Sequence, residues 1–193
     1  DPNQEVVTNQ IVLLRSTDRG ETFQAEYVGK VDYPATYAET WICELTDGRL
    51  VMGSWMVENK EHPDLYFLSK DGGKTFSGPL PMGFQGQSTS ITAYTGNRIW
   101  VPYNQRQHGQ VGVWLALAKP DDDGFHLMEN QIVWEAQIST RSDTTGDFSQ
   151  WTDYSFGEPH CTVLPDGTLL VVLWYEQPNG KGIRYVHLAY EED

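Results

Sequence analysis

Two glutamates at equivalent places in an internal repeat are the strongest candidates for chemistry. Glu39 begins a segment that ends at Leu50, Glu158 begins one that ends at Leu169, and the two segments align without a gap. Two carboxylates that face one aromatic cleft can have their pKa values driven apart, as the acid and base roles of a catalytic pair require. In the alternative interpretation, both side chains only accept hydrogen bonds and tie neighbouring repeats together.

Aromatic, cationic and imidazole side chains accompany this pair. Trp55, Tyr103 and Trp174 could stack on sugar faces, although aromatic rings between repeats also build a core. His160 lies two residues after the second glutamate, on the same strand face if the strand alternates regularly. Arg106 lies in a polar loop and is the best cation for a substrate carboxylate, because a guanidinium can bind one through two parallel bonds. The alternative for Arg106 is a solvated loop residue.

The repeats predict hairpins that would position these residues. In each copy a strand runs into a short turn, Asp47-Gly48, Gly96-Asn97 or Asp166-Gly167, and a second strand follows. Such pairs favour type I′ turns, in which both central residues have positive φ. Four-stranded antiparallel units repeated at this length are typical of β-propeller blades, and helical periodicity is absent. The predicted fold is therefore an all-β propeller, with Glu39, Ser88 and Glu158 at the channel mouth.

A short pattern, Ser-x-Asp-x-Gly-x-Thr-Phe, occurs twice on turns that leave strands. We expect its Asp to accept backbone N–H bonds, its Gly to supply a positive φ, and its Phe to fold over the turn. The fixed positions are Ser16, Asp18, Gly20, Thr22 and Phe23 in one copy, and Ser69, Asp71, Gly73, Thr75 and Phe76 in the other.

This pattern resembles the Asp-box, or BNR repeat, of the sialidase superfamily. The resemblance implies a propeller of six blades, of which this chain supplies three to three and a half, as the C-terminal half. The units are a blade end (1–30), a blade (31–80), a second blade (81–130), and an insertion with the last blade (131–193). The insertion, taken as Ile132 to Phe156, is a candidate lid or rim of a site. We expect either a longer chain or a homodimer to bury the exposed blade faces.

The segment from Phe156 to Glu176 looks like the closing blade of bacterial sialidases. The resemblance implies a glycoside hydrolase that acts on exposed glycans, with carbohydrate as its partner. Glu39 matches the family's partner Glu, whereas Glu158 stands where the family has its Tyr nucleophile. The Phe-Arg-Ile-Pro segment of the family is absent. The alternative is a non-catalytic Asp-box propeller that binds a glycan or a protein.

Composition excludes several other classes of function. The 193 residues hold 13 basic and 27 acidic side chains, a net charge of −14 that repels nucleic acid and anionic membranes. No apolar run has the length of a membrane span. The sequence contains no zinc-binding spacing and no phosphate loop, so we expect no metal and no cofactor. The two cysteines are predicted to be buried thiols, and a secreted or periplasmic location is favoured.

Overall fold

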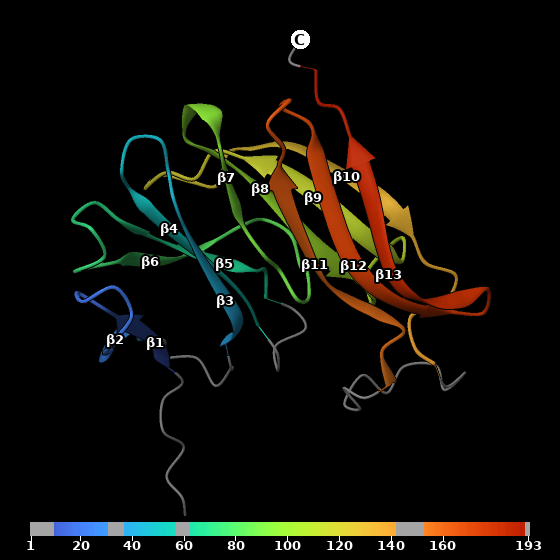
Figure 1. The fold of residues 1–193 in the computed structure, drawn as a ribbon, viewed down its shortest axis with the longest axis horizontal. Helices are drawn as coiled ribbons and strands as arrows, with labels where there is room; N and C mark the ends of the chain where they lie inside the picture. Colours follow the sequence, from blue (N-terminus) through green and yellow to red (C-terminus); the bar gives the residue numbers. More distant parts are fainter. Residues whose placement is uncertain (1–9, 31–36, 57–61, 142–152, 192–193) are drawn as a thin grey trace, which may run out of the picture.

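The computed structural model describes residues 10–30, 37–56, 62–141 and 153–191, and these form four antiparallel sheets (Figure 1). The first sheet pairs β1 (Gln10–Arg15) with β2 (Gln24–Lys30). One complete blade contains β3 (Tyr37–Glu44), β4 (Leu50–Met56), β5 (Leu65–Ser69) and β6 (Ser77–Pro81). The next contains β7 (Thr92–Tyr94), β8 (Arg98–Gln105), β9 (Gly112–Ala118) and β10 (Leu127–Glu135). The last contains β11 (Phe156–Val163), β12 (Leu169–Gln177) and β13 (Gly180–Leu188).

The predicted all-β propeller architecture is confirmed. Strands that are consecutive in the chain are neighbours in every sheet, as in the blades of a propeller. The described residues contain no helix with the length and apolar character needed to cross a membrane.

One predicted boundary is wrong. Ile132 pairs with Trp114, and β10 continues to Glu135, so the segment that begins at Ile132 is the outer strand of a blade and no insertion starts there. Backbone pairing with β9 extends β10 to Glu135, beyond the predicted blade end at residue 130. Residues 142–152, which include most of the predicted rim, lie outside the described residues.

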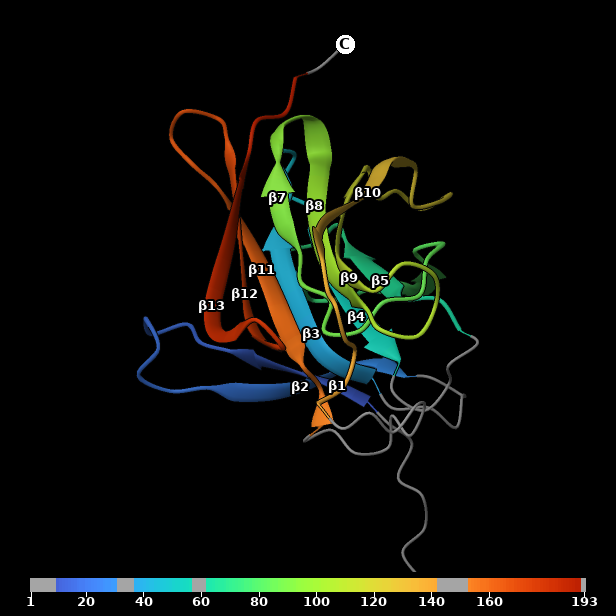
Figure 2. The ribbon, with the colours of Figure 1, turned by 90° about the vertical axis from the view of Figure 1, so that its right-hand side faces the viewer.

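The first strands of the three blades, β3, β7 and β11, lie beside one another at the inner side of the partial ring (Figures 1 and 2). Side chains bond the central blade to the last one. Ser90 Oγ donates to the carbonyl of Pro159 at 2.8 Å, and Thr92 Oγ1 donates to the carbonyl of Cys161 at 2.7 Å. These bonds fix the innermost strands relative to each other.

The core lies between the blades, because alternate residues of each strand face opposite neighbours. On β8, Ile99 and Val101 pack toward the preceding blade, whereas Trp100 packs toward the last blade. All three are at most 2% exposed. Burying such side chains contributes roughly 1.5–3 kcal/mol each. Each blade is therefore stabilised chiefly by the blades on either side of it.

The two octapeptides fold into the same hydrogen-bond network. Asp71 accepts from the Thr75 amide at 2.9 Å and from the Thr75 hydroxyl at 2.6 Å, while Ser69 Oγ donates to it at 2.8 Å. Asp18 repeats all three bonds in the first copy. The bond from the Thr22 hydroxyl contributes most to lowering the pKa of Asp18 to about 2. The turns are thus rigid structural corners.

Two hairpin turns differ from the predicted type. Leu45 N donates to Arg49 O at 2.8 Å, which closes a three-residue loop whose only positive φ is 85° at Gly48. Gly167 repeats this geometry. The prediction of type I′ turns at these two places is wrong, because a three-residue loop with one left-handed glycine connects the strands instead. At Gly96-Asn97 both residues do have positive φ.

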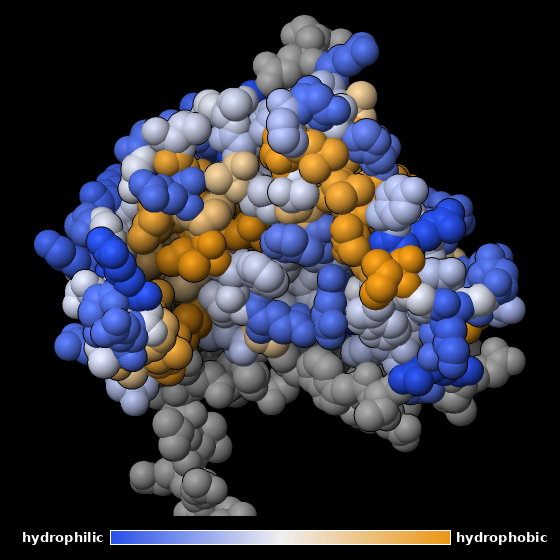
Figure 3. All heavy atoms as spheres, in the orientation of Figure 1, coloured by the Kyte–Doolittle hydropathy of each residue, from blue (hydrophilic) through white to orange (hydrophobic). Residues whose placement is uncertain are grey.

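The two end sheets each leave an apolar face uncovered. Leu14 on β1 is 62% exposed, and Ile183 and Tyr185 on β13 are 71% and 69% exposed. Figure 3 shows apolar side chains gathered over the last sheet and over strands on the left of the molecule. Propeller blades normally bury such faces against a neighbour. Their coverage by a longer chain or by a second copy stays a prediction.

Both cysteines are free thiols, as predicted. Cys43 is half-buried and Cys161 is buried. Burial raises the pKa of each thiol to about 12, so both are protonated at neutral pH.

Asp64 is a buried carboxyl that joins the first complete blade to the next. It accepts a bond from the Gly86 amide at 2.9 Å and another from the Thr89 hydroxyl. Asp64 is 1% exposed. Burial raises the pKa of its carboxyl to about 7, although the two hydrogen bonds act to lower it. A proton therefore stays on folded Asp64 at pH values where an unfolded aspartate has lost it.

We expect Asp64 to make the protein less stable as the pH rises from about 4 to about 7. Between these values the folded state holds a proton that the unfolded state releases, so the free energy of unfolding falls by on the order of 4 kcal/mol. The Asp64→Asn variant keeps a hydrogen-bonding group and has no titration, so its stability changes less across this range. Urea unfolding at several pH values measures the difference. If the free energy of unfolding changed with pH by the same amount in both proteins, the raised pKa of Asp64 would be contradicted.

Candidate functional site

The same backbone bulge begins the inner strand region of all three blades. Glu39, Ser88 and Glu158, the residues predicted to be equivalent, have φ of 48°, 48° and 49°. In each blade, this residue and the one after it lie opposite a single residue of the next strand, which defines a β-bulge. A non-glycine residue in this region costs roughly 1–3 kcal/mol, and such bulges commonly re-aim side chains beside functional sites.

Glu39 is held by a buried indole. Trp55 Nε1 donates to Glu39 Oε2 at 2.9 Å, and Trp55 itself is 1% exposed while Glu39 is exposed. Because its ring is enclosed, Trp55 orients the carboxylate and offers no face to a ligand. The structure therefore corrects the prediction that Trp55 contacts substrate.

Arg106 is a buried cation between the central and last blades. It is 3% exposed, its Nε donates to the carbonyl of Phe156 at 3.2 Å, and its Nη2 donates to the same carbonyl. Its Cζ lies 3.9 Å above the ring of Tyr154. The solvated-loop alternative is therefore wrong, whereas the binding of a substrate carboxylate by Arg106 stays a prediction.

Both glutamates affect the pKa of Arg106. Burial lowers the pKa of Arg106 to about 10, while Tyr154, Glu39 and Glu158 each act in the opposite direction. The guanidinium is therefore charged at neutral pH and interacts electrostatically with two carboxylates from different blades. Their negative charges compensate a cation that has lost its water.

Gly157 makes room for the packing beside Glu158. A Cβ at Gly157 would lie 2.6 Å from Arg106 Nη2 and 3.0 Å from the indole of Trp174. Only glycine lets both groups approach the backbone this closely. Trp174 is half-buried there, so part of its ring is exposed, and its contact with a substrate stays a prediction.

His160 stacks against Trp41 of the first complete blade. The ring centroids are 4.7 Å apart at an interplanar angle of 30°, and both side chains are exposed. β11 contains a bulge between Gly157 and His160, yet Glu158 and His160 are both exposed and Pro159 between them is buried, as the predicted alternation requires. The stack with Trp41 connects the last blade to the first complete blade.

Tyr103 lies away from this cluster. It is 3% exposed, its hydroxyl donates to Asn130 Oδ1 at 2.9 Å, and its ring stacks on Phe84 at 4.4 Å. Since alternate residues of β8 face opposite sides, Tyr103 faces the core and Arg106 faces the last blade. The prediction that Tyr103 binds substrate is corrected accordingly.

Sequence reasoning missed Tyr154 and Gly157. Tyr154 lies in the long segment before β11, where no repeat or motif marks it. Gly157 directly precedes Glu158, and this position beside the repeated glutamate is the feature of the sequence that could have indicated its role. Among the described residues, no group of three His, Cys, Asp or Glu side chains could hold a metal ion.

Chemically, the cluster combines two exposed carboxylates, one charged guanidinium and partly exposed aromatic rings. Such a set can bind hydroxyl groups through the carboxylates and pack sugar C–H faces on the rings. Two carboxylates near one another can also serve as a proton donor and a base or nucleophile.

Comparison with known proteins gives likeness in structure only. No protein-family model matches the sequence, and no curated protein sequence matches it either. A protein of unknown function from Dyadobacter fermentans aligns at a TM-score of 0.69 and 24% identity, covering 91% of this chain and 44% of that one.

Two glycoside hydrolases are also similar. A variant of the NanB sialidase from Streptococcus pneumoniae aligns at a TM-score of 0.66 and 17% identity, covering 94% of this chain and 27% of that one. The α-L-arabinanase of Penicillium chrysogenum, solved with arabinobiose, aligns at 0.63 and 18% identity, covering 96% and 56%. The chain thus spans between about a quarter and just over half of these proteins. It has the propeller fold that they share.

Proposed function

We propose that this chain forms the glycan-processing face of a propeller glycoside hydrolase, with Glu39 and Glu158 at the reaction centre. The observation that carries the proposal is the pair of exposed glutamates at the same strained bulge of two different blades, both of which act electrostatically on buried Arg106. The likeness to a sialidase and an arabinanase supports the same class of reaction. The substrate is an exposed glycan.

The two carboxylates differ in how firmly the structure holds them, which supports different roles for them. Trp55 fixes one oxygen of Glu39 through its indole N–H, whereas no side chain within the described residues bonds to Glu158. An oriented carboxylate suits work on a proton or on the anomeric carbon, which needs a fixed position. The ring of Trp174 and the stacked pair Trp41 and His160 supply surfaces for the sugar.

We expect Glu39→Gln and Glu158→Gln each to lower turnover by about 10²–10⁴-fold, because the amide cannot transfer the proton or attack as a carboxylate does. The measurement is hydrolysis of a panel of aryl glycosides by the protein. Glu44→Gln is the matched control, because Glu44 is an exposed glutamate at the other end of β3. Unchanged turnover in both variants would remove the pair from the mechanism.

We also expect Glu158→Gly to stabilise the protein by about 1 kcal/mol, because glycine adopts a φ of 49° without strain. Glu158→Ala keeps the Cβ and should show no such gain, which makes it the control. Both variants should lose activity if the carboxylate serves function at the expense of stability. Chemical unfolding gives the two free energies. Destabilisation by both substitutions would instead support a glutamate that ties blades together.

A second candidate is a non-catalytic propeller that binds a glycan. It is favoured by the burial of Arg106, which directs its Nε and Nη2 donors to a backbone carbonyl and not to a ligand. Saturable binding on a glycan array, with no product after long incubation, would select this candidate over the hydrolase.

A further inference from the structure

A separate cleft opens between the central and last blades, on the outer side of the sheets. Its volume is about 390 Å³, and its walls come from β10, from the segment after it, and from β12 and β13. This volume lies in the range of small-molecule sites, about 300–1,000 Å³. Neither Glu39 nor Glu158 lines it, so it is distinct from the site at the mouth.

The floor of the cleft is rigid. Gln177 Oε1 accepts bonds from the amides of Gln137 at 2.7 Å and Ile138 at 3.0 Å, and its Nε2 donates to Ser155 Oγ at 3.0 Å. The indole of Trp134 packs edge-on against Phe156, with centroids 5.3 Å apart. A fixed floor and a fixed ring cost little entropy when a ligand binds.

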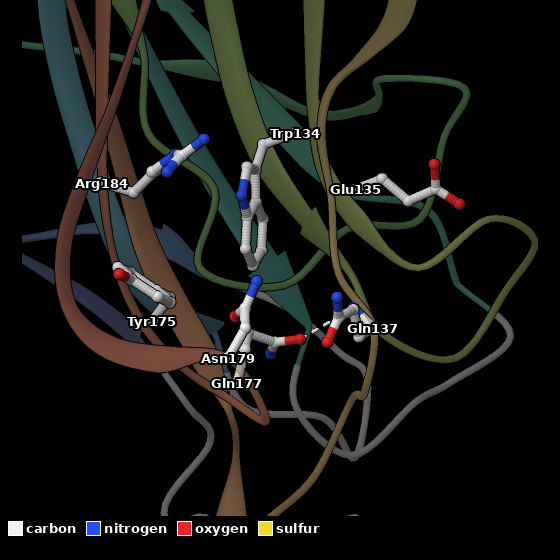
Figure 4. A pocket seen from close by; sticks show the side chains of 7 residues that line it. All are labelled: Trp134, Glu135, Gln137, Tyr175, Gln177, Asn179 and Arg184. Atoms are coloured by element: carbon white, nitrogen blue, oxygen red, sulfur yellow. Dashed lines mark hydrogen bonds between the residues drawn. The ribbon is translucent and has the colours of Figure 1, made fainter.

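Other polar groups around the cleft are free to bind. In Figure 4, Arg184 and Tyr175 lie on one side of the Trp134 indole, and Asn179 lies below it. Within the part of the chain that the structure describes, the side chains of Arg184 and Asn179 form no hydrogen bond or ion pair. Glu135 also lines the cleft, but its carboxylate points away from the other labelled side chains, and Arg184 is the charged group beside the Trp134 indole (Figure 4).

We propose that this cleft is a second saccharide-binding site, which takes one sugar residue that carries a carboxylate. The flat rings of Trp134 and Tyr175 suit the C–H face of a pyranose, and the amide of Asn179 suits its hydroxyl groups. The guanidinium of Arg184 matches a carboxylate through two parallel bonds. This site goes beyond the proposed function, because it would hold part of a glycan without touching either glutamate at the mouth.

The test is a titration of the protein with methyl β-D-glucuronide and, as a neutral match, methyl β-D-glucoside. The indole N–H resonance of Trp134, identified by its loss in Trp134→Phe, reports occupancy of the cleft. We expect the glucuronide to shift this resonance saturably and to bind more tightly than the glucoside. Arg184→Gln should weaken glucuronide binding by about tenfold and leave glucoside binding unchanged.

In Glu158→Gln, both sugars should shift the Trp134 resonance as they do in the unmodified protein, because Glu158 does not line this cleft. An unmoved Trp134 resonance up to the solubility limit of the sugars would overturn the proposal. Equal shifts by both sugars, unaffected by Arg184→Gln, would do the same, as would a loss of the Trp134 shift in Glu158→Gln. Because the readout is binding at Trp134, these results do not depend on whether the glutamates hydrolyse anything.

Discussion

The bulge repeated at the inner edge of three blades is the constraint on which the site depends. In each blade it places one non-glycine residue near a φ of 48°, and in two blades that residue is a glutamate. A strain of roughly 1–3 kcal/mol at each position persists only where the surrounding structure fixes it, and here the blade packing does so. Glu39 and Glu158 are exposed at their bulges, whereas Ser88 at the equivalent bulge of the central blade is buried.

Buried Arg106 connects this constraint to the packing of the blades. A guanidinium without water is costly, and its cost is offset by the carbonyl of Phe156, the ring of Tyr154 and the two nearby carboxylates. Gly157 allows the close approach that this arrangement requires. Stability and the chemistry of the site therefore share the same few contacts, and the joint between the central and last blades is also a wall of the site.

Local patterns predicted the fold well. The octapeptides around Asp18 and Asp71 fixed the turns, because their bonds run within a few residues. The internal repeat also predicted that Glu39, Ser88 and Glu158 are equivalent, and all three have the same positive φ. Features that depend on contacts between blades could not be predicted from local patterns or from the repeat. The burial of Tyr103 and the position of Tyr154 beside Arg106 follow from inter-blade packing, which leaves no periodic signal in the sequence. The bond from Trp55 to Glu39 lies within one blade, but it depends on a bulge that the sequence pattern does not show.

The central claim is that a glycan binds where Glu39, Glu158 and Trp174 meet. A crystal structure of the protein with an oligosaccharide that binds it saturably in solution is the most direct test. The account predicts a sugar ring within hydrogen-bond distance of at least one of the two carboxylates, with its face toward an aromatic ring of the mouth. Sugar density found only elsewhere on the molecule, under conditions that saturate binding in solution, would contradict it.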